Sequence, residues 1–147
     1  MWGGAYRWDG RGKHWIPLTD SFGASEENLY GIESIAADPS NPDLLYLAAG
    51  KYDKESLRSW GQWKNGDPEP CDVLKSADRG KTWRRVESFP VKGQAPLGLV
   101  FAVFDPNSGH RGKSTPKIFI GVYGEGVYAN KDGGPLMHEK SVKFNIT

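Results

Sequence analysis

The Asp and Glu residues of this chain are the ones best suited to acid–base chemistry. Several of the Asp residues, however, lie in predicted turns. A catalytic carboxyl transfers protons, whereas an Asp in a turn accepts hydrogen bonds from backbone N–H groups of that turn. Four carboxylates lie next to Pro or close to Gly, the residues that favour turns: Asp38, Asp78, Asp105 and Asp132. Turn formation is therefore the stronger interpretation for these four side chains.

Metal and cofactor chemistry finds little support in the sequence. The three histidines are far apart and lack the spacing of metal ligands: His14, His110 and His138. The single cysteine, Cys71, excludes an intrachain disulfide and a Cys-rich metal site. No Gly-rich phosphate loop precedes a helix. We therefore expect no metal and no cofactor.

Charge and hydropathy argue against two further classes of partner. Nineteen basic and eighteen acidic residues give a formal charge of +1, and the basic residues are scattered, which argues against nucleic-acid binding. No apolar run approaches the ~18 residues of a membrane span, so we expect no membrane partner. Residues 1–4 show no basic region followed by an apolar stretch, so no secretion signal is visible and the localisation stays open.

Residues 76–83, Ser-Ala-Asp-Arg-Gly-Lys-Thr-Trp, indicate the element that organises the chain. The flanking segments are typical of short strands, so this stretch predicts the turn of a β-hairpin. Ser76 and Asp78 can hold the turn through their side chains. Gly80 can take a positive φ, and Trp83 can fold its ring under the turn. These roles are structural.

The same pattern occurs twice more in weaker form. Residues 130–137 keep Asp132 and Gly134 but have Asn in place of Ser and Met in place of Trp. Residues 8–15 keep only the Gly and the final Trp at the same spacing. The segments around each copy predict further strands, including a final strand at 141–146.

The copies delimit a repeated unit of four strands. Whole units occupy residues 33–88 and 98–146, and a half unit occupies residues 3–19. Four short strands per repeat without helical periodicity are typical of a β-propeller. We therefore predict an all-β fold, with residues 1–147 forming one partial β-propeller of about two and a half blades of four antiparallel strands. Open blade edges expose unpaired backbone groups, so we expect homo-oligomers formed through these edges.

The turn sequence resembles a known motif, and a longer stretch resembles a known family. Residues 76–83 resemble the Asp-box, or BNR repeat, S-x-D-x-G-x-x-W, which marks blade geometry and no activity. A more specific match has its segments in this order: 3–8, 15–20, 28–34, Asp38-Pro39, Tyr46 and 74–83. Together these segments are similar to the N-terminal propeller of the xyloglucanases of glycoside hydrolase family 74.

The resemblance implies little catalysis by this chain alone. Members of the family are glucanases with two seven-bladed propellers, and one catalytic Asp comes from each propeller. Inverting hydrolysis needs two carboxyls about 6.5–9.5 Å apart. Met1 stands at the position of the N-terminal catalytic Asp, and no second propeller is present in the sequence. The carboxylates left within the matched segments are Asp20 and Glu33, for which loop or capping roles are the stronger interpretation.

Aromatic side chains are the better candidates for contact with a glycan, because the apolar faces of sugar rings stack on aromatic rings. The candidates are Tyr6, Trp8, Tyr30, Trp60 and Trp63. For Tyr6 and Trp8, which lie in a predicted strand, the blade core or a blade interface is the stronger interpretation. Trp60 and Trp63 lie in the polar insertion 51–70, for which packing on the blade or in a subunit interface is an equal alternative.

The sequence supports three functional hypotheses. The first is a xyloglucanase-like propeller fragment that is not catalytic alone, binds β-glucan or xyloglucan-type glycans, and self-assembles. The second is a glycoside hydrolase of the endo-glucanase or xyloglucanase type whose site is completed by another copy or chain. The third is a protein-interaction scaffold. The resemblance favours the first, in a family that is usually secreted.

Overall fold

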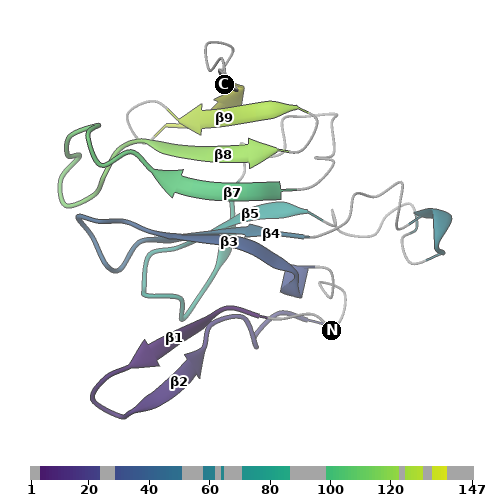
Figure 1. Cartoon of the computed structure of the whole chain (residues 1–147), viewed down its shortest axis with the longest axis horizontal. Coiled ribbons are helices and arrows are strands. Elements are labelled where there is room, and N and C mark those ends of the chain that lie inside the picture. Colours follow the sequence, from purple (N-terminus) through teal and green to yellow (C-terminus); the bar gives the residue numbers. More distant parts are fainter. Residues whose placement is uncertain are drawn as a thin grey trace, which may run out of the picture.

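Three antiparallel sheets lie one after another in the fold (Figure 1). The computed structural model describes residues 4–23, 29–50, 58–61, 64, 71–86, 99–122, 125–130 and 134–138. Its strands form a two-stranded sheet and two four-stranded sheets in which consecutive strands are neighbours. Apart from short helical turns at 29–30 and 58–59, the described secondary structure is β. The fold is thus all-β, built from propeller blades as the sequence predicted.

The two-stranded sheet is a hairpin that corresponds to half a blade. It consists of β1 (Tyr6–Asp9) and β2 (His14–Pro17). Tyr6 pairs with Pro17, and Trp8 pairs with Trp15. Because side chains alternate across a sheet, these four share one face, which we call the outer face of the hairpin. Ile16 lies on the opposite, inner face and packs on the neighbouring blade.

The first four-stranded sheet, called the middle blade here, follows the hairpin. Its strands are β3 (Ile32–Ala37), β4 (Leu45–Ala49), β5 (Asp72–Ser76) and β6 (Arg84–Arg85). The turn between β3 and β4 is held by its own side chains. Asp38 accepts a hydrogen bond from the N–H of Ser40 (2.8 Å), and Asn41 accepts one from the N–H of Asp43 (3.2 Å). These are the turn roles that Asp and Asn favour.

The second four-stranded sheet, called the last blade here, repeats this arrangement. Its strands are β7 (Leu99–Phe104), β8 (Ile118–Val122), β9 (Gly126–Asn130) and β10 (Leu136–His138). Asp105 follows β7 as Asp38 follows β3, and it accepts a hydrogen bond from the N–H of Asn107 (2.9 Å). Both Asp-Pro signals therefore mark a turn between the first two strands of a blade.

The strand β10 corrects the predicted extent of the turn after β9. We expected a turn that runs to Met137, followed by a strand at 141–146. Instead, Leu136–His138 pairs with β9, and Leu136 is buried in the core between the blades. The turn therefore ends before Leu136, because this side chain fills that core. Residues 141–146 and Asp132 lie outside the described residues, so the strand at 141–146 stays a prediction.

The turn after β9 also differs from the turn at 76–83. Lys75 pairs with Arg84, nine positions later, whereas Ala129 pairs with Met137, eight positions later. The turn after β9 is therefore one residue shorter. Asn130, which stands at the Ser76 position, is buried and its Oδ1 accepts a hydrogen bond from the N–H of Ile118 (2.7 Å). This side chain joins neighbouring strands.

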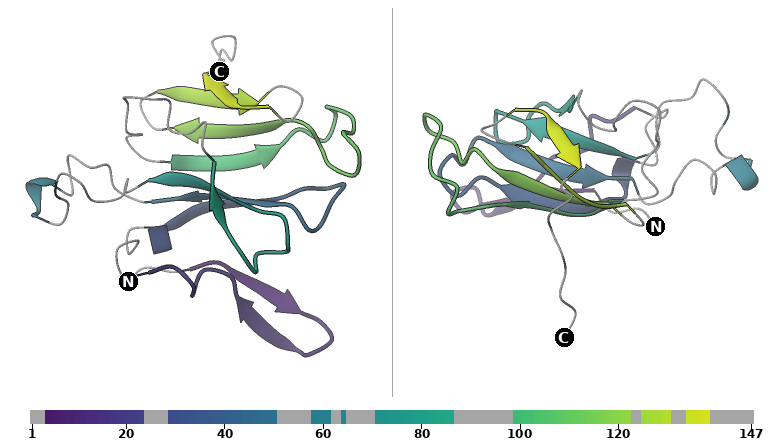
Figure 2. Two further views of the ribbon diagram at one scale, coloured as in Figure 1. Left: turned by 180° about the vertical axis from the view of Figure 1, so that it is seen from behind. Right: turned by 90° about the horizontal axis from the view of Figure 1, so that it is seen from above.

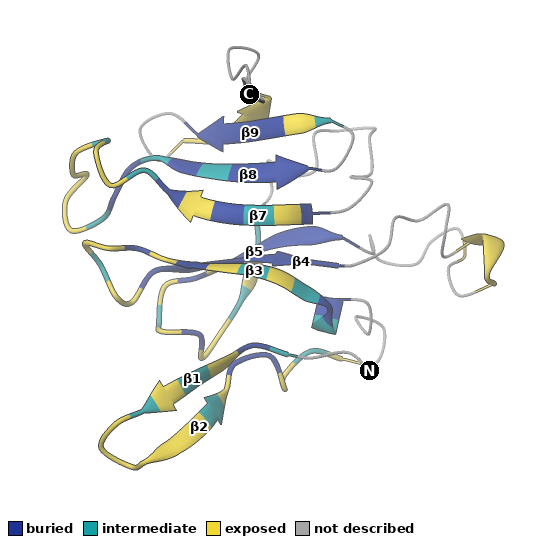
Figure 3. Cartoon of the chain, viewed as in Figure 1, coloured by how far each residue is buried: buried dark blue, intermediate teal, exposed yellow. Residues whose placement is uncertain are grey.

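The inner strands of the middle blade, β4 and β5, are covered on both faces and are almost entirely buried (Figure 3). All five residues of β4 are buried, and their side chains alternate between two cores. We call the side turned toward the last blade the forward face: Ala36, Tyr46, Ala48 and Val73. The side turned toward the hairpin is the rear face: Leu45, Leu47, Ala49 and Leu74. The chain thus stacks hairpin, middle blade and last blade in sequence.

Polar contacts join the middle blade to the last blade at two places. Asp38 is buried, and its carboxylate accepts hydrogen bonds from the N–H (2.8 Å) and the hydroxyl (2.6 Å) of Thr115. Ser34 accepts a hydrogen bond from the N–H of Ala102 (3.0 Å) in β7. The buried bonds between Asp38 and Thr115 are expensive to break, because the group left behind loses its partner. They fix the two blades relative to each other.

Candidate functional site

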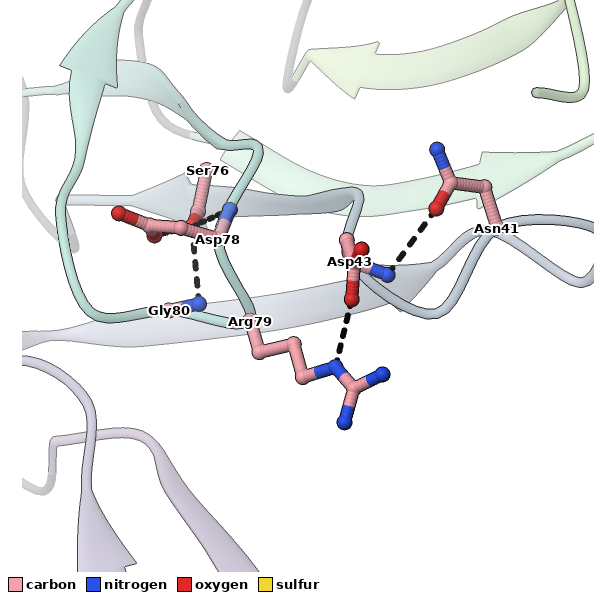
Figure 4. Close-up of polar contacts among 6 residues, drawn as sticks. All are labelled: Asn41, Asp43, Ser76, Asp78, Arg79 and Gly80. Atoms are coloured by element: carbon pink, nitrogen blue, oxygen red, sulfur yellow. Dashed lines mark hydrogen bonds and ion pairs between the residues drawn. The ribbon is translucent and has the colours of Figure 1, made fainter. Parts of the chain in front are cut away.

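The turn at 76–83 is closed by its own Ser and Asp side chains (Figure 4). Ser76 is buried, and its Oγ accepts hydrogen bonds from the N–H groups of Gly80 (2.8 Å) and Asp78 (3.3 Å). Asp78 accepts hydrogen bonds from the hydroxyl (2.5 Å) and the N–H (2.9 Å) of Thr82. The bonds from Thr82, together with that from Ser76, lower the pKa of Asp78 to about 2. This carboxylate holds the turn and is a poor proton acceptor.

The same turn contacts the β3–β4 loop and the hairpin. Arg79 reaches the loop, where its Nε lies 2.5 Å from Oδ1 of Asp43 (Figure 4). Gly80 has a φ of 85°, and a Cβ at this position would lie 2.9 Å from Leu18. Trp83 donates a hydrogen bond from Nε1 to the carbonyl of Leu18 (2.6 Å). Gly80 and Trp83 therefore position the hairpin beside the middle blade.

A cleft of about 350 Å³ lies where the hairpin meets this turn. It is lined by Arg7, Ile16, Pro17, Leu18, Asp20, Ser21, Arg79, Gly80 and Lys81. Three lining residues are cationic and one is a carboxylate. The Nε of Arg7 is buried and has no hydrogen-bond partner among the described residues. The cleft is thus a cationic pocket with one acidic group.

The two catalytic candidates are not brought together in this cleft. Asp20 is exposed and lines it, whereas Glu33 is exposed on β3 and is not among the lining residues. Inverting hydrolysis needs two carboxyls about 6.5–9.5 Å apart, one acid and one base. Among the described lining residues, Asp20 is the only carboxylate. The cleft by itself therefore lacks the pair that this chemistry requires.

The structure shows that Tyr6 and Trp8 are not core residues of the described blades, whereas their place in a blade interface stays a prediction. Their side chains are 55% and 50% exposed on the outer face of the hairpin. Trp15, which the sequence analysis did not single out, is 62% exposed on the same face, and its ring lies 5.4 Å from that of Trp8. The alternation along the two hairpin strands is the signal that could have placed these three rings on one face.

The other aromatic candidates lie elsewhere. Tyr30 is half-buried and donates a hydrogen bond to the carbonyl of Phe22 (2.6 Å), so its hydroxyl serves the loop before β3. Trp60 is 55% exposed. It lies within residues 58–61, which stand away from the three sheets (Figure 2). Trp63 lies outside the described residues.

The described residues contain neither a candidate metal site nor a candidate membrane span. No group of three or more His, Cys, Asp or Glu side chains in this part of the chain could hold a metal ion. No helix of the described segments is long and apolar enough to cross a membrane.

Comparisons with known proteins give consistent matches, although no family model matches the chain. The chain is 33% identical to xyloglucanase Xgh74A of Acetivibrio thermocellus over 90% of its own length and 22% of that protein. It is 31% identical to an oligoxyloglucan-reducing end-specific xyloglucanase of Emericella nidulans, over 90% of this chain and 20% of that one. The chain thus spans about a fifth of the length of these curated relatives.

A solved structure gives a similar match. The GH74 xyloglucanase from Xanthomonas campestris matches 97% of this chain and 28% of its own, with 32% sequence identity and a TM-score of 0.45.

Proposed function

Because this chain is homologous to part of the xyloglucanases of glycoside hydrolase family 74, we propose that it binds xyloglucan-type β-glucans and does not hydrolyse them alone. The observation that carries the proposal is the 33% identity over 90% of the chain to a xyloglucanase. Binding requires a surface that sugar rings can stack on, and hydrolysis requires two facing carboxyls. The described residues offer exposed aromatic rings for stacking, whereas the described lining of the cleft has a single carboxylate.

Trp60 is the side chain that we assign to the glycan. Its side chain is 55% exposed. The segment 58–61 that carries it stands apart from the three sheets (Figure 2), where an extended polysaccharide can approach it. Binding residues are found on loops more often than on the elements that the loops connect. Trp63 is its neighbour in the same insertion and is the second residue to test.

The carboxylates support binding rather than hydrolysis. Asp20 stands among three cationic lining residues of its cleft, and Glu33 lies on β3 outside that lining. The position that the family resemblance assigns to a catalytic Asp is Met1. Among the described residues that line the cleft, Asp20 therefore has no second carboxyl with which to form a proton-transfer pair.

Calorimetric titration with a xyloglucan oligosaccharide tests the binding. We expect saturable binding by the whole chain and a loss of about fivefold or more in affinity for Trp60→Ala, since one aromatic contact is worth about 1 kcal/mol or more. Val100→Ala is the matched control, because Val100 is 52% exposed on the last blade and is not aromatic. Equal affinities for wild type and Trp60→Ala would contradict the assignment of Trp60, and absence of binding would contradict the proposal.

Reducing-sugar release from xyloglucan tests the second half of the proposal. We expect no release at high protein concentration. Release that Asp20→Asn abolishes would overturn this part and favour the alternative, a glycoside hydrolase whose site is completed by self-association.

A further inference from the structure

The cleft between the hairpin and the turn at 76–83 is built from three separate segments of the chain. Strand β1 supplies Arg7, the end of β2 and the loop after it supply residues 16–18, 20 and 21, and the turn supplies residues 79–81. Both walls therefore belong to units that the structure describes. The volume of about 350 Å³ lies in the range of small-molecule pockets, so the cleft has the size of a site for one small molecule.

Arg79 is held in place by the β3–β4 loop. Its backbone N–H donates a hydrogen bond to the carbonyl of Asp43 (3.0 Å), and its Nε lies 2.5 Å from Oδ1 of the same residue. Its φ of 63° lies in the left-handed region, which residues with a Cβ rarely adopt and which is often found at binding sites. Figure 4 shows the two terminal nitrogens of Arg79 turned away from Asp43. A cation fixed in this way loses little side-chain entropy when it binds an anion.

Arg7 brings a second guanidinium group to the cleft. Its Nε is buried and lacks a hydrogen-bond partner within the described part of the chain. A buried donor without an acceptor is costly, so this position favours a ligand that supplies one. The two oxygens of a carboxylate can bind Nε and a terminal nitrogen of one guanidinium together, once the side chain turns toward the cleft. Lys81 adds a third, exposed cation to the lining, which therefore suits a carboxylate.

The rest of the lining suits a sugar ring better than a bare anion. The N–H of Phe22 donates a hydrogen bond to the carbonyl of Thr19 (3.1 Å), so Asp20 and Ser21 occupy the central positions of a turn. Both are exposed, and their side-chain oxygens can accept hydrogen bonds from hydroxyl groups. Residues 16–18, Ile-Pro-Leu, add apolar surface on which the apolar face of a sugar ring can lie.

We propose that this cleft binds a uronic acid, which is a sugar ring that carries a carboxylate. The carboxylate binds the guanidinium groups of Arg7 and Arg79, and the hydroxyls donate hydrogen bonds to Asp20 and Ser21. The apolar face of the ring packs on residues 16–18. Inorganic phosphate fits less well, because it has no apolar face and its second negative charge is repelled by the Asp20 carboxylate.

This site is separate from the one assigned to xyloglucan. Trp60 is not among the residues that line the cleft, and xyloglucan-type β-glucans are neutral glycans that need no cation. The uronic acid site therefore goes beyond the proposed function and does not rest on it. It also gives Asp20 a role that needs no second carboxyl, namely to accept hydrogen bonds from sugar hydroxyls.

Nuclear magnetic resonance titration of the ¹⁵N-labelled chain tests the proposal, with sodium glucuronate and glucose as a matched pair of ligands. The two sugars have the same ring and differ in the carboxylate. We expect glucuronate to shift the backbone signals of Ser21 and Gly80 and the Nε–H signal of Arg79 in a saturable way. Glucose should not shift them at the same concentration, and added NaCl should weaken the binding of glucuronate.

Two variants assign the binding to the cleft. Arg7→Gln should lower the affinity for glucuronate by about tenfold, because it removes charge-assisted hydrogen bonds to the carboxylate. Lys81→Glu should lower it by about fivefold or more, because an attraction becomes a repulsion. Lys81 is exposed, so this variant should fold even where Arg7→Gln does not. Lys113→Glu is the matched control, because Lys113 is also exposed and does not line the cleft.

Four results would overturn the proposal. They are no shift with glucuronate, equal shifts with glucose, equal affinities for Lys81→Glu and Lys113→Glu, and binding of inorganic phosphate as tight as that of glucuronate. The last result would indicate a general anion site. Xyloglucan binding is measured separately by calorimetry. Its absence, with glucuronate binding retained, would count against the proposed function alone, and the reverse result would count against the uronic acid site alone.

Discussion

The forward faces of the middle blade and the last blade have the same strand pattern and different surroundings. Tyr46 and Phe119 occupy the same position, second in the second strand of each blade. Tyr46 is buried against Phe104, whereas Phe119 is half-buried beside the Nζ of Lys117, 4.8 Å from its ring centre. The apolar pattern of a blade therefore predicts which face can pack on a neighbour. How deeply that face is buried depends on the unit that packs against it.

Truncation of the two aromatic rings should separate the two faces most strongly. We expect Tyr46→Ala to lower the free energy of unfolding by about 3–5 kcal/mol, because it leaves a cavity between two blades. Phe119→Ala should cost about 1 kcal/mol, because solvent already reaches this ring. Urea unfolding at low protein concentration measures both. Equal costs would show that the two faces are buried alike.

Removal of the Asp side chain should destabilise the fold more in the Asp-Pro turn of the middle blade than in that of the last blade. Asp38→Ala leaves the buried N–H and hydroxyl of Thr115 without their acceptor, and we expect a cost of about 1–3 kcal/mol. Asp105→Ala removes one bond within its own turn and should cost less than about 1 kcal/mol. Thermal unfolding of the two variants side by side measures the difference. A larger cost at Asp105 would contradict the view that Asp38 joins the two blades.

The smallest effect at neutral pH is expected from Tyr46→Phe. Burial, with a further contribution from the Asp38 carboxylate, raises the pKa of Tyr46 to about 12 from its ordinary value of 10.0. The neutral phenol therefore stabilises the fold fully below pH 10, and this contribution is lost as the pH rises through 12. It amounts to about 2–3 kcal/mol, which the Phe variant does not lose.

Unfolding of wild type and Tyr46→Phe across this range checks the prediction. The two proteins should be similar at pH 7, and the variant should be the more stable one near pH 12. Parallel pH profiles would show that Tyr46 is not buried as described.

Local sequence patterns were sufficient to predict the strands but not the last of them. The run Leu45–Ala49 is apolar throughout and predicts a buried strand, which is what β4 is. In contrast, β10 begins at Leu136 because this side chain fills the core between two blades. That core contains residues from both blades, so the pattern within one turn could not indicate it. Local propensity predicts an element, and tertiary packing sets its boundary.

The sequence could predict only those residues of the candidate site that lie in a recognisable segment. Asp20 could be named from its matched segment, but the cations that share its cleft could not. Arg7 and Lys81 are 74 positions apart, and the contact between the hairpin and the 76–83 turn brings them together. The exposure of Trp8 likewise depends on which side of the hairpin is covered by the described middle blade, which a strand pattern does not show.

The central claim is that the forward faces of the middle blade and the last blade have equivalent strand registers and that only the first is fully covered. Thiol labelling tests it directly, with Val103→Cys and Ala36→Cys each placed in a Cys71→Ser background. We predict slow labelling of the Cys at position 36, because Ala36 is buried. The Cys at position 103 should react much faster, because Val103 is 48% exposed. Equal labelling rates at the two positions would contradict the account.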